Sequence, residues 1–148
     1  MGAAELESET KRATAMSYKV LLCDDEPHIL RAAQIKLQRN GFEVRTAFDG
    51  EEGWRILQEW MPDVMVTDYQ MPRLDGLGLI ARCRADEATR SLKIIMLSAK
   101  GYELSEAEIV AKYGVSKLLR KPFSPRELLS HVQELVETGD LAAAAGSH

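Results

Sequence analysis

Short apolar segments alternate along this chain with longer segments in which apolar residues recur every three or four positions. Three of the short segments are continuously apolar, which is typical of strands covered on both faces: 20–23, 64–66 and 94–97. Weaker strand patterns lie at 42–47 and 117–119, which we expect nearer the edges of a sheet. The pattern therefore predicts five strands separated by helices.

The helices between these strands have readable starts. Capping boxes, in which Ser is followed three positions later by Glu, lie at 105–108 and 124–127. Apolar positions at helical spacing predict a further helix after the first strand, namely Leu30, Ala33 and Leu37. Alternating strands and helices favour right-handed βαβ crossovers and a mainly parallel sheet with helices on both faces. We therefore expect a doubly wound, three-layer α/β fold.

One domain accounts for most of the 148 residues. Residues 1–17 are polar without periodicity, and 139–148 offers only small side chains around the alanine run 142–145. We expect both segments to be flexible tails on a single domain spanning 18–138. Hydrophobic residues make up 45% of the chain and charged residues 28%, so a core of ordinary size can form.

Charge and hydropathy exclude several classes of protein. The 19 basic and 23 acidic side chains give a net charge of −4 without a basic block, so we expect no direct binding of nucleic acid. Apolar runs stay well below the roughly 20 residues that span a bilayer, and the first residues do not resemble a signal peptide. The two cysteines, Cys23 and Cys83, lie in apolar stretches and are expected reduced in the core of a cytoplasmic protein.

Polar residues follow the predicted strands where each strand ends. Asp24 and Asp25 follow the first strand, Asp68 the third, Ser98 the fourth and Lys121 the fifth. Ligands of open parallel sheets bind beyond the carboxyl ends of the strands. Clustered carboxylates repel one another, and Mg²⁺ with its oxygen ligands is a common way to offset that repulsion. With a lysine and a hydroxyl opposite the metal, the carboxylate of Asp68 could act as a nucleophile and form an aspartyl phosphate.

Four motifs in this order and spacing resemble the receiver domain of two-component response regulators, the CheY-like group. They are Asp-Asp-Glu-Pro at 24–27, the segment from Asp68 to Gly76, Ser-Ala-Lys at 98–100 and Lys-Pro-Phe at 121–123. The resemblance extends over almost all of 18–138. It implies a five-stranded parallel sheet in the order 2-1-3-4-5, which CheY-like and flavodoxin-like proteins share.

The resemblance also implies a role for each residue of the metal site. Asp68 corresponds to the phosphoacceptor. Asp25 corresponds to the direct Mg²⁺ ligand, and Asp24 to the acidic neighbour that acts through metal-bound water. The backbone carbonyl of Gln70 would complete the metal set together with Asp68. The implied donor is a phosphohistidine on a sensor histidine kinase or a phosphotransfer protein.

The remaining family positions concern how the phosphoryl group is sensed. Ser98 corresponds to the Ser or Thr that moves toward the phosphoryl group, and Lys121 to the lysine that ion-pairs with it. The bond from Lys121 to Pro122 is often cis in relatives. Leu118 stands where the family usually has Tyr or Phe, whose ring changes rotamer when the hydroxyl moves. We therefore expect the signal to pass through Ser98, the loop after it and the helix that begins at Ser105.

The predicted function is a phosphorylation switch and not an enzyme that turns over a separate substrate. The domain would catalyse only its own phosphorylation and dephosphorylation. We expect a monomer or weak dimer that acts on a downstream protein target.

Three alternatives fit parts of the pattern. Phosphatases or phosphotransferases of the haloacid-dehalogenase type carry Asp-x-Asp after the first strand, whereas Asp24 and Asp25 are adjacent here. A flavodoxin-like FMN site needs a Ser/Thr/Gly-rich loop there, and the three acids 24–26 would repel its phosphate. A degenerate receiver that binds partners without phosphorylation is favoured by Leu118 but opposed by the complete set of site residues.

Two positions are predicted to set the lifetime of the phosphate. Gln70 lies two residues after Asp68 and Lys100 two residues after Ser98, and in relatives these positions flank the path of the attacking water. We expect Lys100 to shield the acyl phosphate electrostatically, so Lys100→Ala should lose phosphate faster than the parent. The decay of radiolabel after removal of the phosphodonor measures this. A decay no faster than that of the parent would contradict shielding.

Overall fold

A computed structural model of the chain describes residues 18–98 and 105–146. It contains one sheet of five parallel strands in the order β2-β1-β3-β4-β5, which confirms the predicted order. The strands are β1 (Lys19–Cys23), β2 (Glu43–Ala47), β3 (Val64–Asp68), β4 (Lys93–Ser98) and β5 (Lys117–Arg120). The two weaker strand patterns form the edge strands β2 and β5.

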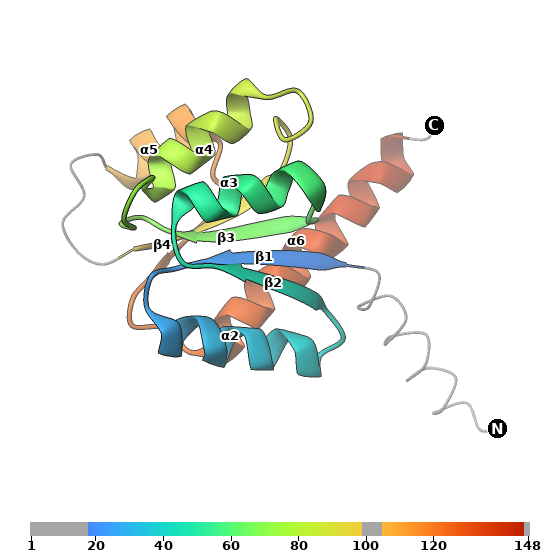
Figure 1. The fold of residues 1–148 in the computed structure, drawn as a ribbon. Helices are drawn as coiled ribbons and strands as arrows, with labels where there is room; N and C mark the ends of the chain where they lie inside the picture. Colours follow the sequence, from blue (N-terminus) through green and yellow to red (C-terminus); the bar gives the residue numbers. More distant parts are fainter. Residues whose placement is uncertain (1–17, 99–104, 147–148) are drawn as a thin grey trace.

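Helices cover both faces of this sheet. They are α2 (Pro27–Arg39), α3 (Gly50–Glu59), α4 (Gly76–Ala85), α5 (Glu106–Tyr113) and α6 (Pro125–Gly146). Figure 1 shows α3, α4 and α5 on one side of the sheet and α2 and α6 on the other. Within the described part of the chain, no helix combines the length and the apolar character that crossing a membrane requires.

Two apolar clusters join the helical layers to the sheet. Val20 and Leu22 of β1 pack in the cluster shared with α2 and α6, whereas Leu21 and Cys23 pack in the cluster shared with α3, α4 and α5. Successive side chains of a strand point to opposite faces, so both faces of β1 are buried. This explains why the central strands have continuous apolar sequences. Cys23 and Cys83 are free thiols buried in the second cluster.

The two capping boxes start helices as predicted. The Ser105 hydroxyl accepts a hydrogen bond from the Glu108 N–H (3.2 Å), and the Ser124 hydroxyl accepts one from the Glu127 N–H (3.1 Å). Helix α6 continues to Gly146, past the domain boundary expected at residue 138. Alanine has the highest helix propensity, so the run 142–145 extends the helical backbone although it lacks large apolar side chains.

Close backbone contacts hold the loop that follows Asp68. The Gly76 N–H donates to the Tyr69 carbonyl (2.9 Å), and the Gly50 N–H donates to the Leu74 carbonyl (3.0 Å). A Cβ atom on Gly76 would lie 2.1 Å from the carbonyl oxygen of Asp68, which is far inside van der Waals contact. Only glycine therefore fits where α4 begins beside the end of β3.

We predict that Gly76→Ala destabilises the domain by about 2 to 4 kcal/mol, because the backbone of Asp68 must move to admit the methyl group. Gly78→Ala, in the same helical turn, is the matched control. Its Cβ would meet the Cδ1 atom of Leu74 at 2.6 Å, and this flexible side-chain end can move aside. Urea unfolding should therefore show a loss within about 1 kcal/mol for Gly78→Ala. Equal losses in the two variants would contradict the backbone clash.

Candidate functional site

The predicted site residues meet at the carboxyl edge of the sheet. Asp24 and Asp25 follow β1, Asp68 is the last residue of β3, Ser98 is the last residue of β4, and Lys121 follows β5. Parallel pairing places the end of β1 next to β3, and β3 next to β4. Segments distant in the sequence therefore contribute to one small volume.

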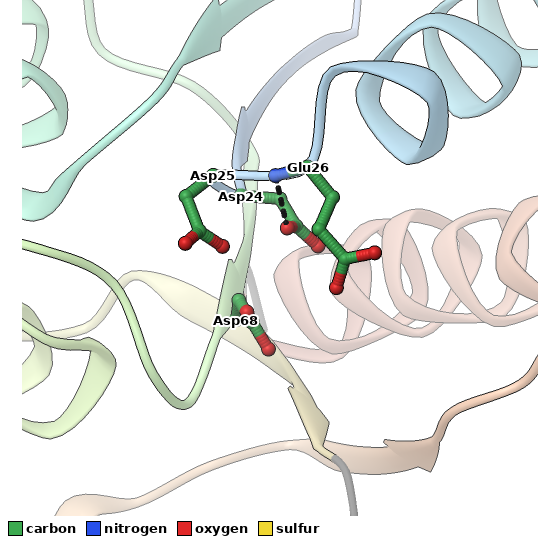
Figure 2. Close-up of side chains that lie close together, drawn as sticks. All are labelled: Asp24, Asp25, Glu26 and Asp68. Atoms are coloured by element: carbon green, nitrogen blue, oxygen red, sulfur yellow. Dashed lines mark hydrogen bonds between the residues drawn. The ribbon is translucent and has the colours of Figure 1, made fainter.

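Four carboxylates form a cluster at this edge (Figure 2). Each offers an oxygen, and the four oxygens lie within 4.8 Å of one another: Asp24, Asp25, Glu26 and Asp68. Asp24 and Asp68 are buried, whereas Asp25 is exposed. The Oδ1 atom of Asp24 accepts a hydrogen bond from the Glu26 N–H (2.9 Å). Its buried Oδ2 atom makes no aligned hydrogen bond among the described residues, and four carboxylates this close together suit a cation with oxygen ligands.

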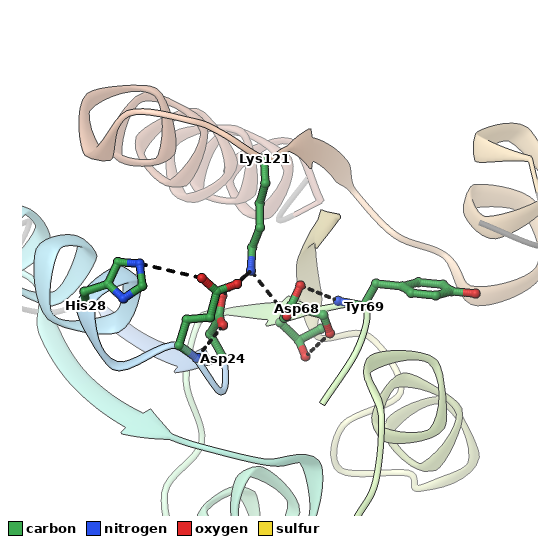
Figure 3. Close-up of polar contacts among 7 residues, drawn as sticks. Asp24, His28, Asp68, Tyr69 and Lys121 are labelled. Atoms are coloured by element: carbon green, nitrogen blue, oxygen red, sulfur yellow. Dashed lines mark hydrogen bonds and ion pairs between the residues drawn. The ribbon is translucent and has the colours of Figure 1, made fainter. Parts of the chain in front are cut away.

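Lys121 is the ammonium group that faces these carboxylates. Its Nζ atom lies 3.0 Å from Asp24 Oδ2, 3.0 Å from Glu26 Oε1 and 3.3 Å from Asp68 Oδ2. Figure 3 shows the lysine side chain reaching between Asp24 and Asp68. The contact with Glu26 is also a hydrogen bond, whereas the other two are ion pairs by distance only. The lysine side chain is 13% exposed, so water screens these ion pairs only weakly.

Burial and mutual repulsion change the pKa values in the cluster. Burial raises the pKa of Asp68, the charge of Asp24 adds to this, and the value reaches about 6 although Lys121 opposes the shift. Burial also raises the pKa of Asp24, despite the Glu26 N–H and Lys121. Burial lowers the pKa of Lys121, but the hydrogen bond to Glu26 and the nearby charges of Asp24 and Asp68 outweigh burial and raise it. The cluster thus holds excess negative charge that a bound cation would relieve.

The remaining predicted residues surround this cluster. Ser98 is buried, and its carbonyl accepts a hydrogen bond from the Lys121 N–H (2.7 Å). The Lys121–Pro122 peptide bond is cis, as the family resemblance implied. Leu118 lies on β5 beside Met96 and packs partly buried against the cluster under α3, α4 and α5.

Two predicted residues lie apart from these contacts. Gln70 is exposed in the loop after β3. Lys100 lies outside the described residues, so its predicted effect on phosphate lifetime stays a prediction.

A comparison with known protein families agrees with this geometry. The model of the response regulator receiver domain matches residues 20–133. The chain belongs to the response regulator receiver domain family. Receiver domains are phosphoacceptor switches of two-component signalling and are not generally classed as enzymes.

Relatives of this receiver domain support the same assignment. The alkaline phosphatase synthesis transcriptional regulatory protein PhoP of Bacillus subtilis is 34% identical over 128 residues, which cover 86% of this chain and 52% of PhoP. The solved receiver domain of Francisella response regulator 1452 is 34% identical with a TM-score of 0.73, covering 82% of this chain and 98% of that one. The solved structure of chemotaxis protein CheY4 of Vibrio cholerae is 30% identical with a TM-score of 0.73, and the match covers 80% of this chain and 98% of that one. The chain spans about half the length of the curated relatives it matches.

Glu26 is a site residue to which the sequence motifs assigned no role. It follows Asp25 directly. A residue that precedes a proline is also typical of a helix start, and Glu26 is indeed the N-cap of α2. The run of three acids was the available signal, but nothing in the sequence indicates that the third side chain contacts Lys121. That contact joins residues 95 positions apart in the chain.

The raised pKa of Asp68 predicts how pH affects the stability of the metal-free receiver domain. The pKa of Asp68 is about 6 in the folded protein, compared with 3.8 for an ordinary aspartate in the unfolded chain, so the folded state binds this proton more tightly. The contribution of Asp68 to stability therefore falls as pH rises from about 4 to about 6. Asp68→Asn should raise the free energy of unfolding by about 1 kcal/mol above pH 7, less than the full shift because solvent reaches part of the site.

Urea unfolding in the presence of a chelator, at about pH 4 and above pH 7, measures this effect. The gain from Asp68→Asn should be much smaller at the lower pH, where the folded carboxyl binds its proton and the unfolded carboxyl is about half protonated. A gain of the same size at both pH values would show that burial does not raise this pKa.

Proposed function

We propose that this receiver domain accepts a phosphoryl group on Asp68 from a phosphohistidine of a sensor histidine kinase or a phosphotransfer protein. The observation that carries the proposal is the position of the Asp68 carboxylate, buried beside an acidic cluster and 3.3 Å from the Lys121 ammonium. Acidic residues alone would repel a phosphoryl group. A carboxylate flanked by a cation-binding cluster and an ammonium can receive one.

Asp24, Asp25 and Asp68, with the backbone carbonyl of Gln70, would hold Mg²⁺. The donor set supports this, because it consists of oxygens only and its four carboxylates lie close together. When bound, Mg²⁺ would offset the charge of the carboxylates and of the phosphoryl oxygens.

The chemistry of the chain follows from three side chains. A carboxylate oxygen of Asp68 attacks phosphorus, the P–N bond of the phosphohistidine breaks, and its electron pair returns to the imidazole nitrogen. Asp68 has a pKa of about 6, so this nucleophile is mostly ionised at neutral pH. Lys121 stabilises the charge on the phosphoryl oxygens, and the Ser98 hydroxyl donates a hydrogen bond to one of them. Attack of water on phosphorus reverses the modification, so both reactions are the domain's own.

The switch follows from the charge that phosphorylation adds. An aspartyl phosphate places close to two further negative charges in the site, and Lys121 and Ser98 would turn toward it. The Ser98 carbonyl and the Lys121 N–H are hydrogen-bonded, so the ends of β4 and β5 respond together. Because Leu118 has no ring to rotate, we infer that the change reaches a partner protein through Ser98 and the start of α5.

Phosphorylation with a small acyl-phosphate donor tests this proposal. The parent should gain one phosphoryl group in the presence of Mg²⁺, detected by intact mass or by radiolabel, and a chelator should prevent the gain. Asp68→Asn should lose incorporation entirely because the amide is not a nucleophile for phosphorus. Asp63→Asn is the matched control, since Asp63 lies at the opposite end of β3 and accepts a hydrogen bond from the Lys19 N–H.

A parent protein that gains no phosphoryl group under these conditions would contradict the proposal. That result would favour a degenerate receiver that acts as a protein-interaction module without phosphorylation. Incorporation that persists in Asp68→Asn would instead place the acceptor at another residue.

A further inference from the structure

Glu26 makes the hydrogen bond that fixes the Lys121 ammonium, yet the proposed function gives this carboxylate no part. Its Oε1 atom accepts from Lys121 Nζ at 3.0 Å. The ammonium also lies near Asp24 and Asp68, but neither of these contacts is a hydrogen bond. Glu26 is therefore the best-oriented partner of Lys121 among the described residues.

Hydrogen bonds hold both backbone polar groups of Glu26, the N–H and the carbonyl. The Glu26 N–H donates to Asp24 Oδ1 (2.9 Å), and the Glu26 carbonyl accepts from the N–H groups of Ile29 (3.1 Å) and Leu30 (3.2 Å). These bonds place Glu26 at the start of α2. A residue held in this way can direct its carboxylate at a fixed point of the site.

Glu26 differs from the other two carboxylates around Lys121 in its surroundings. Its side chain is 44% exposed at the mouth of the site, and its Oε2 atom lies 3.6 Å from Nε2 of the exposed His28. Asp24 and Asp68 are buried and belong to the set that would hold Mg²⁺. When they share their charge with a metal ion, their attraction for the ammonium weakens. The hydrogen bond that Glu26 accepts from Lys121 does not depend on these two residues.

We propose that Glu26 is a positioning residue that keeps the Lys121 ammonium at the mouth of the site when Asp24 and Asp68 are engaged by Mg²⁺. This inference rests on the proposed function. The lysine stem has four rotatable bonds, so an ammonium without this anchor samples positions from which it cannot reach a phosphoryl oxygen. The competing assignment is that Glu26 is itself a metal ligand, since its carboxylate also lies in the acidic cluster.

Glu26→Gln is the decisive variant because it keeps the size of the side chain and removes its charge. Glu51→Gln is the matched control. The Glu51 side chain is 47% exposed, comparable to Glu26, and it is ion-paired with Arg82 (3.0 Å) on the helices α3 and α4. The two variants change the net charge equally, but only Glu26→Gln alters a contact of Lys121.

Hydrogen exchange of the Lys121 ammonium, measured by ¹H–¹⁵N NMR and assigned with Lys121→Arg, tests the anchor without any reaction. In the presence of a chelator, Glu26→Gln should exchange only slightly faster than the parent, because the charges of Asp24 and Asp68 still attract the ammonium. With saturating Mg²⁺, its exchange should become about tenfold faster than in the parent, whereas Glu51→Gln should match the parent. Equal exchange in all three proteins with Mg²⁺ would overturn the proposal.

Two further measurements separate positioning from metal binding. At saturating Mg²⁺, Glu26→Gln should accept phosphate from the acyl-phosphate donor about tenfold more slowly than Glu51→Gln. Its Kd for Mg²⁺ should stay within about threefold of the parent, while Asp25→Asn weakens binding at least about tenfold. A loss of Mg²⁺ affinity in Glu26→Gln as large as in Asp25→Asn would make Glu26 a ligand and overturn the proposal. If the parent accepts no phosphate, the proposed function fails, and the ammonium exchange still decides the role of Glu26.

Discussion

The attraction between one ammonium and several carboxylates determines how this site is built. Lys121 lies within 3.3 Å of oxygens from Asp24, Glu26 and Asp68, which come from the segments after β1 and at the end of β3. Repulsion among buried carboxylates would push these segments apart, and the ammonium opposes that repulsion. Lys121 does not offset the full cost, because burial and, after it, the neighbouring carboxylates still raise the pKa values of Asp24 and Asp68. The site therefore has a standing affinity for a further positive charge.

The sheet order explains why a lysine fills this position. Strand β4 lies between β3 and β5, so a residue after β5 must reach across a neighbouring strand to contact Asp68. The hydrogen bond from the Lys121 N–H to the Ser98 carbonyl anchors the lysine backbone beside β4. The long side chain then spans the remaining distance to Asp24 and Asp68.

Many features of the fold could be predicted because they depend on residues close together in the sequence. The continuous apolar run 64–66 predicts a strand that is buried on both faces, and the Ser105 and Ser124 capping boxes predict helix starts that the structure confirms. The end of α6 at Gly146 could not be predicted from packing signals, because alanines extend a helix through backbone propensity alone. Leu118 shows a limit of another kind. It stands where the family usually has an aromatic ring, and the sequence does not indicate which side chain takes over the role of that ring.

The sequence by itself determined the strands, the helix starts and the candidate residues Asp24, Asp25, Asp68, Ser98 and Lys121. The strands and helix starts follow from periodicity and capping, which are properties of neighbouring residues, and the candidate residues follow from their places at strand ends and in four short motifs. Only the tertiary structure decided that Glu26 binds Lys121, that Gly76 lies against the carbonyl of Asp68, and that the pKa of Asp68 rises to about 6. The physical reason is that burial and ion pairing depend on which crossovers bring distant segments together. No local pattern encodes the distance between two groups that lie 95 residues apart.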